Sequence, residues 1–396
     1  MAPNRKTSIN TRLVHGGRYP HDNHGVINPP VYRASTILKP TLADWKAMRD
    51  PASKAYTYGR AGVPTTRSFE EVVAELYGAA DAVAVSSGLA SVVGCLFAVL
   101  SAGDHLLMVD SAYGPTRKFC DVVLTRYGIE TTYYDPLIGA GIESLIKENT
   151  KAVYTESPGS LTFEVQDLPA IAEVAHRHGA AVLLDNTWAT PLYLDPLALG
   201  VDIVNEAVTK YINGHSDVMM GVIVSNEHYA KQVRTSVKLQ GQYSSPDELY
   251  LAQRGIRTLG VRLRQAEQTG LSLARWLKQQ EMVEAVLHPA LEDDPGHEIW
   301  KRDFTGASGL FAIVLKPAAE EAFAAMIDGF ELFGLGASWG GYESLVKPGN
   351  VQAERSATTW PYEGPLLRIN AGLEDPEDLI TDLRAGLERY AAIAGV

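Results

Sequence analysis

Short apolar segments alternate with amphipathic helical segments between residues 66 and 225. Seven of the apolar segments have the length and composition of strands: VAVS from 83, HLLMVD from 105, IETTYY from 129, AVYTE from 152, AAVLLD from 180, VDIV from 201 and GVIV from 221. Strands that are separated by helices form βαβ units, in which neighbouring strands run parallel. The pattern therefore predicts an α/β domain with a mostly parallel central sheet.

The last third of the chain shows a different pattern. A long helical segment comes first, and single strands and helices follow it without regular alternation. The predicted elements are a helix from about Pro246 to Leu277, a strand in SGLFAIVL from 308, a helix over 318–327, a strand in LLRIN from 366 and a helix from Pro376 to about Ala391. We expect a large domain over 56–250 and a smaller C-terminal α+β domain over 251–396.

Residues 1–55 differ from both of these parts. They are rich in Asn, Pro, Gly and His, contain the break Asn28-Pro29-Pro30, and show little sustained periodicity. We expect them to form an N-terminal arm that gains its structure by packing elsewhere.

Composition narrows the class of partner. The formal net charge of −12 over 396 residues argues against a nucleic-acid partner, because phosphate binding requires a basic surface. There is no apolar stretch of signal-peptide length at the N-terminus, and no segment approaches the ~20 apolar residues of a membrane span. We expect a cytoplasmic protein with no membrane partner and a small-molecule substrate. Cys95 and Cys120 lie among apolar residues and are expected to be buried free thiols.

Lys210 and Asp185 carry the first chemical hypothesis. Lys210 follows the apolar strand VDIV in the segment AVTKYINGHSDVMMG, and Asp185 ends the strand AAVLLD. Ligands of open α/β sheets bind beyond the carboxyl ends of strands. A lysine that binds pyridoxal 5′-phosphate (PLP) covalently and an acid that keeps its ring nitrogen protonated are the two groups this cofactor requires. The alternatives are a surface charge for Lys210 and a helix N-cap for Asp185.

A phosphate site is predicted where SSGLAS, from Ser86, leads into an apolar helix. Main-chain N–H groups at a helix start bind phosphate, and glycine permits close approach, so Gly88 and Leu89 are candidates. Arg60, in Tyr58-Gly59-Arg60, could grip a phosphate with two donors. The alternatives are a common capped turn and an exposed loop charge.

Two further residues are candidates for substrate chemistry. Tyr113, in DSAYGPTRKFC, follows another strand and offers a flat face for a ring; the alternative is a core tyrosine. Arg368 lies on the apolar strand LLRIN, where a cation needs an anionic partner such as the carboxylate of an amino acid. We expect no metal site, since His176 and His178 are two apart on a predicted helix and face different ways.

At this point the motifs show a family resemblance. SSGLAS, SAYGPT, ESPGS, LLDNTW, TKYINGHSD, SWGGYESL and LLRINAGLED, in this order and spacing, resemble the PLP-dependent Cys/Met metabolism (trans-sulfuration) family over essentially the whole chain. The resemblance implies the aspartate-aminotransferase-like fold type I and carbon–sulfur chemistry on an amino-acid thioether. Ser160, Trp339 and Tyr342 favour the cystathionine β-lyases of bacteria, which release homocysteine, pyruvate and ammonia in methionine biosynthesis.

The resemblance also implies residue roles. Lys210 matches the lysine that binds PLP, Asp185 the partner of the ring nitrogen, and Tyr113 the tyrosine that stacks on the ring; all three are expected to be catalytic. The phosphate site is expected to contain Gly88, Leu89, Thr209 and, from the neighbouring subunit, Tyr58 and Arg60. The substrate carboxylate site matches Arg368 and Ser338, with Trp339 beside it. A homotetramer, a dimer of dimers, is expected.

One residue and one segment depart from the family pattern. Ala207 stands where many γ-family members carry a serine that contacts the phosphate. The segment KLQGQYSSPDE from Lys238 matches no part of the family pattern and is expected to shape the distal substrate pocket. The alternatives are therefore another carbon–sulfur lyase of the family or a cystathionine γ-synthase. A dinucleotide enzyme is disfavoured because no GxGxxG follows the first strand. A cofactor-free binding protein is disfavoured because every expected catalytic position is filled.

Overall fold

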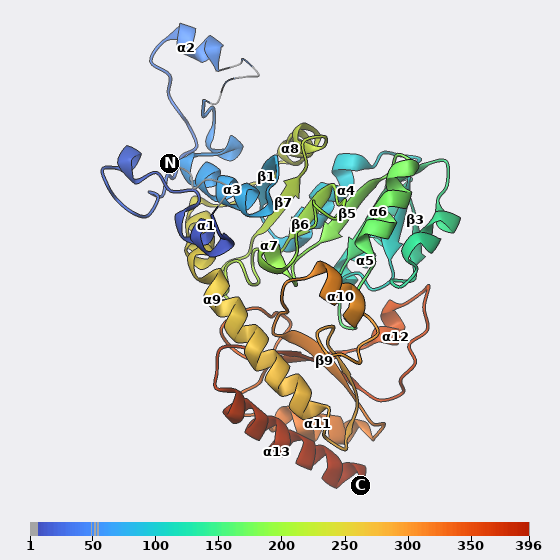
Figure 1. Cartoon of the computed structure of the whole chain (residues 1–396). Helices are drawn as coiled ribbons and strands as arrows, with labels where there is room; N and C mark the ends of the chain where they lie inside the picture. Colours follow the sequence, from blue (N-terminus) through green and yellow to red (C-terminus); the bar gives the residue numbers. More distant parts are fainter. Residues whose placement is uncertain (1–6, 49, 51–52, 54, 396) are drawn as a thin grey trace.

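The computed structural model describes residues 7–48, 50, 53 and 55–395 and contains two sheets, one above the other in Figure 1. The upper sheet has seven strands in the order β1-β7-β6-β5-β4-β2-β3. Their bounds are β1 Asp81–Val85, β2 His105–Val109, β3 Glu130–Tyr134, β4 Thr150–Glu156, β5 Ala181–Asp185, β6 Ile203–Glu206 and β7 Gly221–Ser225. All seven predicted strands are confirmed. The sheet is mostly parallel, and only β7 runs antiparallel to its neighbours β1 and β6.

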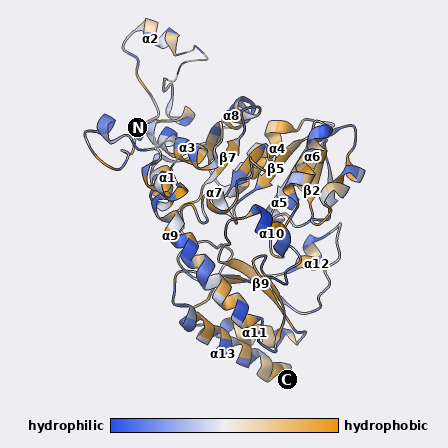
Figure 2. Ribbon diagram, viewed as in Figure 1, coloured by the Kyte–Doolittle hydropathy of each residue, from blue (hydrophilic) through white to orange (hydrophobic). Residues whose placement is uncertain are grey.

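Helices cover this sheet on both faces (Figure 1). They are α3 Pro64–Tyr77, α4 Gly88–Val99, α5 Gly114–Phe119, α6 Leu168–Arg177, α7 Thr190–Tyr193 and α8 Ala230–Leu239. Strands that are covered on both faces read as continuous apolar runs, which explains why HLLMV and GVIVS are buried along their whole length. Apolar residues are accordingly concentrated on the strands in Figure 2. Cys95 and Cys120 are free and buried, as predicted.

The lower sheet has five strands in the order β10-β11-β12-β9-β8. The strands are β8 Val283–Leu287, β9 Leu310–Leu315, β10 Gly334–Leu335, β11 Leu345–Gly349 and β12 Leu366–Asn370. The helices of this part are α10 His297–Asp303, α11 Glu320–Asp328, α12 Val351–Glu354 and α13 Pro376–Ala394. The predictions located β9, β12, α11 and α13 but not β8, β10 or β11. Neither β10, with two residues, nor β11, LVKPG, carries a clear apolar pattern.

Helix α9, Pro246–Leu277, connects the two parts (Figure 1) and has the predicted bounds. Its start is fixed by Ser245, whose hydroxyl accepts the N–H of Asp247, and by Pro246 in the first turn. Its first half packs into the core of the upper sheet, and Leu273 and Leu277 pack into the core of the lower one. A division of the chain between residues 250 and 251 would fall inside this helix, and it remains a proposal.

The N-terminal arm contains α1, Ile9–His15, and α2, Leu42–Ala47. Helix α1 packs on the body: Leu13 is buried, and its carbonyl oxygen accepts a hydrogen bond of 2.7 Å from Arg257. Helix α2 projects away from the body (Figure 1), with Leu42 68% and Trp45 44% exposed. The apolar surface of the arm is therefore uncovered in a single chain. None of the helices in the described part of the chain combines the length and hydropathy that a membrane span requires.

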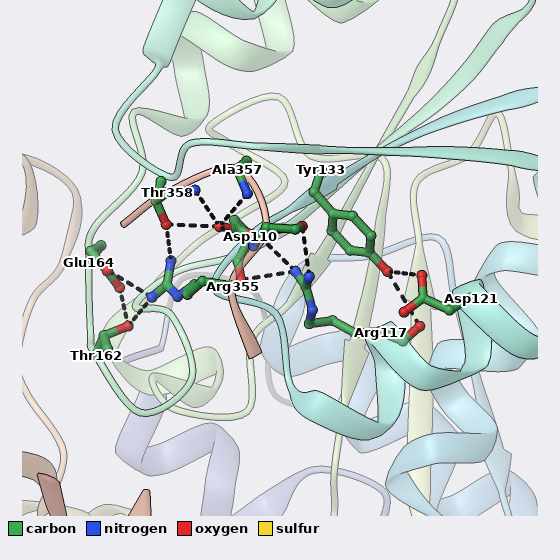
Figure 3. A network of polar contacts seen from close by, with 10 residues as sticks. Asp110, Arg117, Asp121, Tyr133, Thr162, Glu164, Arg355, Ala357 and Thr358 are labelled. Atoms are coloured by element: carbon green, nitrogen blue, oxygen red, sulfur yellow. Dashed lines mark hydrogen bonds and ion pairs between the residues drawn. The ribbon is translucent and has the colours of Figure 1, made fainter. Parts of the chain in front are cut away.

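A buried carboxylate at the end of β2 fixes a late segment of the chain beside the sheet (Figure 3). Asp110 accepts the N–H groups of Ser356, Ala357 and Thr358 and pairs with Arg117 at 2.9 Å. These bonds hold residues 355–358, which have no regular secondary structure. A second pair, Arg355 with Glu164 at 2.8 Å, holds the same segment from the other side. Contacts with the side chains of Asp110 and Glu164 therefore hold residues 355–358 in place without a helix or strand.

Candidate active site

Three polar residues lie side by side at the ends of neighbouring strands of the upper sheet, where Asn205 is the last residue but one of β6. Glu156 of β4 is in register with Asp185 of β5, which is in register with Asn205 of β6. Asp185 Oδ1 accepts the N–H of Thr187 at 3.0 Å and its hydroxyl at 2.5 Å, and Asp185 Oδ2 accepts the Asn205 amide at 2.9 Å. Asp185 is therefore not a helix N-cap but a carboxylate held at the sheet end. Burial raises its pKa, and the hydrogen bonds from Thr187 and Asn205 oppose that rise.

Lys210 lies in the turn that follows β6. Its Nζ donates to Ser338 Oγ at 2.6 Å and lies 5.4 Å from the ring centre of Trp339. Burial lowers the pKa of Lys210 to about 8; repulsion by Arg368 adds to this effect, and Asp185 opposes it. About a tenth of the Lys210 side chains therefore carry an uncharged amine at pH 7, far more than for an ordinary lysine, and this is the form that can attack a carbonyl or accept a proton.

Close packing of the loop 336–341 brings Ser338 and Trp339 to Lys210. Gly340 has φ +79°, and a Cβ atom there would lie 3.1 Å from the N of Tyr211 and 3.2 Å from Lys210 Cβ. The N–H of Gly340 also donates to Asn370 Oδ1 at 3.0 Å. Both the backbone conformation and the close approach require glycine here.

Arg368 lies on β12 and is 6% exposed. Its Nη2 donates to the carbonyl oxygens of Ala337 and Ser338, both at 3.0 Å. Within the described residues its partners are these carbonyls, which orient the guanidinium without neutralising it, and its pairing with a substrate carboxylate stays a prediction. Burial lowers its pKa to about 10. The uncompensated charge leaves Arg368 able to bind a carboxylate.

Tyr113 precedes α5 and is 45% exposed, so it is not a core tyrosine. Its N–H donates to Glu156 Oε2 at 2.7 Å. Partial burial raises the pKa of the Tyr113 phenol, and the charge of Arg368 opposes that rise. The hydrogen bond therefore holds the backbone of Tyr113 at the end of β4. The sequence interpretation assigned no role to Glu156, although an acidic residue at a strand end is the same signal that identified Asp185.

The start of α4 lies beside the Lys210 turn. Ser87 Oγ accepts the N–H of Ala90 at 3.1 Å, whereas the N–H groups of Gly88 and Leu89 have no acceptor in the described part of the chain. A Cβ atom at Gly88 would lie 2.7 Å from the Cβ of Ala207. Only glycine therefore allows the helix start to approach the turn this closely, and two amides remain open for an anion.

Three residues that were expected to bind the phosphate make no hydrogen bond to the start of α4 within the described part of the chain. The hydroxyl of Thr209 accepts a hydrogen bond of 3.0 Å from the backbone N–H of Met220. Tyr58 is 49% exposed, and Arg60 donates to the carbonyl oxygen of Lys238 at 3.0 Å. Their roles stay predictions. The divergent segment from Lys238 also reaches the helix start, since Gln242 accepts the hydroxyl of Ser86 at 3.0 Å.

The two histidines discussed above lie on or next to α6 and bind acidic residues: His176 pairs with Asp202 at 2.9 Å, and His178 with Glu143 at 3.5 Å. In the described ranges, no group of three or more His, Cys, Asp or Glu side chains could hold a metal ion.

These groups fit PLP. The open amides of Gly88 and Leu89 suit its phosphate, the lowered pKa of Lys210 suits a covalent bond to its aldehyde, and the buried carboxylate of Asp185 suits its ring nitrogen. The three groups are brought together by the ends of β5 and β6 and the start of α4.

Comparisons with known proteins agree with this chemistry. The sequence pattern described as Cys/Met metabolism PLP-dependent enzyme matches residues 10–388. Cystathionine beta-lyase MetC of Escherichia coli (strain K12) is 42% identical over 388 residues, covering 96% of this chain and 98% of that protein. An L-alanine/L-glutamate racemase of Wolbachia pipientis wMel is 40% identical over 393 residues, covering 96% of this chain and 97% of that protein.

A solved structure shows the same fold. Cystathionine gamma synthase from Xanthomonas oryzae pv. oryzae, in complex with cystathionine, matches with a TM-score of 0.90 at 30% identity, covering 98% of this chain and 99% of that chain. The expected fold type I is confirmed. The chain belongs to the Cys/Met metabolism family of PLP-dependent enzymes.

Proposed function

We propose that the protein is a cystathionine β-lyase, which cleaves the Cβ–S bond of L-cystathionine to give homocysteine, pyruvate and ammonia for methionine biosynthesis. The observation that carries the proposal is the contact of Lys210 Nζ with Ser338 Oγ at 2.6 Å, beside Trp339 and the unneutralised Arg368. This arrangement supports a base that acts next to a carboxylate site. The identity of 42% to a named cystathionine β-lyase supports the choice of reaction.

The residues that would hold the cofactor are Lys210 at its aldehyde, Asp185 at its ring nitrogen, Tyr113 on its ring face, and Gly88, Leu89 and Thr209 at its phosphate. When bound, PLP supplies an electron-withdrawing ring that makes the proton on the substrate Cα acidic. Asp185 increases that withdrawal because a carboxylate stabilises a protonated ring nitrogen.

Arg368 would bind the substrate, and Lys210 would accept a proton from it. Arg368 binds the α-carboxylate, which directs the Cα–H toward the Lys210 side. Lys210, with a pKa of about 8, accepts that proton in its uncharged form. Ser338 Oγ holds the Lys210 amine in place. The ring of Trp339 lies beside the amine, with its centre 5.4 Å from Nζ.

Tyr113 would act as the acid. Its raised pKa means that the phenol carries its proton at neutral pH and has one to donate. As the Cβ–S bond breaks, the sulfur keeps the bonding electrons and takes a proton from Tyr113 or from protonated Lys210. Homocysteine then leaves, and the remaining three-carbon fragment reacts with water to give pyruvate and ammonia.

We also propose a cytoplasmic homotetramer in which Tyr58 and Arg60 reach the phosphate of a neighbouring subunit. The support is the family resemblance of the segment and the exposed apolar surface of the arm, where Leu42 and Trp45 project from the body (Figure 1). The measurement is light scattering of the purified protein, with deletion of residues 1–55 as the comparison.

The experiment on the reaction measures all products from L-cystathionine in the PLP-loaded protein. Equal amounts of pyruvate and homocysteine would establish the β-lyase. Cysteine with 2-oxobutyrate would make it a γ-lyase, and cystathionine formed from an activated homoserine and cysteine would make it a γ-synthase. Because a racemase is similar at 40% identity, conversion of L-alanine to D-alanine is measured in the same preparation.

A further inference from the structure

The carboxylate of Asp185 has one acceptor position left. A carboxylate offers about four lone-pair sites, two on each oxygen. Thr187 fills both sites of Oδ1 with its N–H and its hydroxyl, and the Asn205 amide fills one site of Oδ2 at 2.9 Å. The remaining site on Oδ2 is therefore the position that a further donor can use, and Asn205 determines which side of that oxygen is open.

Asn205 is itself held in a single orientation. It is 1% exposed, and its Oδ1 accepts the hydroxyl of Tyr154 at 2.9 Å. Since a carboxylate only accepts hydrogen bonds, the –NH₂ end of the amide must face Asp185, and the oxygen must face the Tyr154 hydroxyl. The amide can therefore neither rotate nor exchange its donor for its acceptor without losing both bonds.

Asn205 also bears on which carboxyl group at the sheet end is ionised. Glu156 and Asp185 are register partners on adjacent strands, and two neighbouring buried carboxyl groups do not readily share two negative charges. Asp185 receives three hydrogen bonds, whereas the one described for the Glu156 carboxyl group comes from the N–H of Tyr113. Burial and the charge of Asp185 raise the pKa of Glu156 well above its usual range. The donors thus favour the anion on Asp185 and the proton on Glu156.

We propose that Asn205 is a positioning residue that keeps Asp185 ionised and aims its one open acceptor site at the ring nitrogen of PLP. The inference rests on the PLP dependence of the family and is independent of the substrate. Thr187 also helps to position Asp185. Its hydroxyl, which donates to Asp185, accepts the N–H of Ala207 at 3.0 Å and so links Asp185 to the Lys210 turn.

The test compares two cofactors on apoenzyme variants. Asn205→Leu keeps the approximate shape of the side chain and removes the donor. Tyr154→Phe is the matched control, because it removes the other hydrogen bond of the same amide and leaves the donor to Asp185 in place. The ligands are PLP and its carbocyclic analogue, in which a C–H replaces the ring nitrogen. The analogue keeps the aldehyde and the phosphate, so it still uses Lys210 and the start of α4.

We expect Asn205→Leu to weaken PLP binding about tenfold or more, the size of one hydrogen bond to a charged group, while binding of the analogue changes by less than about twofold. Tyr154→Phe should change both affinities by less than about threefold. If Asn205→Leu does not fold, by circular dichroism, Asn205→Ala is compared in the same way. Equal weakening of both ligands, or no weakening of PLP, would overturn the proposal. Neither readout uses cystathionine, so a different substrate would leave this test intact.

Discussion

Lys210 Nζ lies 2.6 Å from Ser338 Oγ, although the two residues are 128 positions apart in the sequence. Lys210 belongs to the turn after β6, and Ser338 belongs to the loop between β10 and β11. The contact therefore brings the two sheets together at one point. A base on one sheet and a carboxylate site on the other are both needed for the proposed reaction.

Lys210→Ala should abolish cystathionine cleavage, because it removes both the covalent link to PLP and the base that takes the Cα proton. Some PLP should still bind without the covalent link, through Asp185 and the start of α4. The measurements are pyruvate release and the absorbance of the protein after gel filtration. Near-normal turnover in a purified variant would refute the role of Lys210.

The lowered pKa of Lys210 predicts a pH dependence of cofactor uptake. Only the uncharged amine attacks the aldehyde, and the pKa of about 8 means that its fraction rises with pH and levels off above that value. The rate at which the apoenzyme takes up PLP should therefore increase about tenfold from pH 7 to pH 9. The control is free Nα-acetyl-lysine, whose rate should keep rising beyond pH 9. An enzyme rate that still rises steeply above pH 10 would contradict the lowered pKa.

Arg368→Leu should chiefly raise the KM for cystathionine, because in the proposed reaction Arg368 would contact the substrate carboxylate in both ground and transition states. Loss of a charge-assisted contact should raise KM roughly 10- to 100-fold. Arg368→Lys serves as the comparison, since it keeps the charge but not the two donors. An unchanged KM in Arg368→Leu would exclude this residue from the carboxylate site.

Gly88→Ala should weaken PLP binding. The added Cβ would lie 2.7 Å from the Cβ of Ala207 and would push the start of α4 away from the Lys210 turn. The control is Gly141→Ala, whose added Cβ would meet only the Ile138 side chain, at 3.2 Å. Equilibrium dialysis of PLP should show at least about a tenfold loss for Gly88→Ala and none for Gly141→Ala. Equal affinities would mean that the helix start does not bind the phosphate.

Asp110→Asn should destabilise the protein by about 3 kcal/mol, because it leaves Arg117 unpaired and several donors of residues 356–358 poorly matched. Asp121→Asn, in the same network but exposed, should cost less than about 1 kcal/mol. Urea unfolding measures both.

The same carboxylate predicts an acid-dependent loss of stability. Hydrogen bonds from residues 356–358 and the charge of Arg117 hold the pKa of Asp110 below its ordinary value of 3.8, despite the opposing effect of burial. Its stabilising effect is thus present above pH 3.8 and is lost as the pH falls through the lower folded value. Wild type and Asp110→Asn should therefore converge in stability at low pH. A constant difference down to pH 2 would argue against an ionised Asp110.

The sequence alone determined the upper sheet and the long helix α9, and it singled out Lys210 and Ser338, which the structure brings into contact. Strands buried on both faces are continuous apolar runs, and α9 has a serine cap, a proline in its first turn and a long apolar stripe. Both signals are local. Asp185 and Lys210 were found for the same reason, because Asp185 ends one recognisable strand and Lys210 lies in the turn that follows another.

Only the tertiary structure decided what surrounds those residues. Asn205 acts on Asp185 through strand register, and Ser338 reaches Lys210 through a loop of the other sheet that glycine lets approach. Arg368 turned out to be oriented by two carbonyl groups, and the pKa of Lys210 depends on burial that no local pattern encodes. Local sequence fixes backbone preference and polarity, whereas the distance between side chains far apart in the chain depends on how whole elements pack.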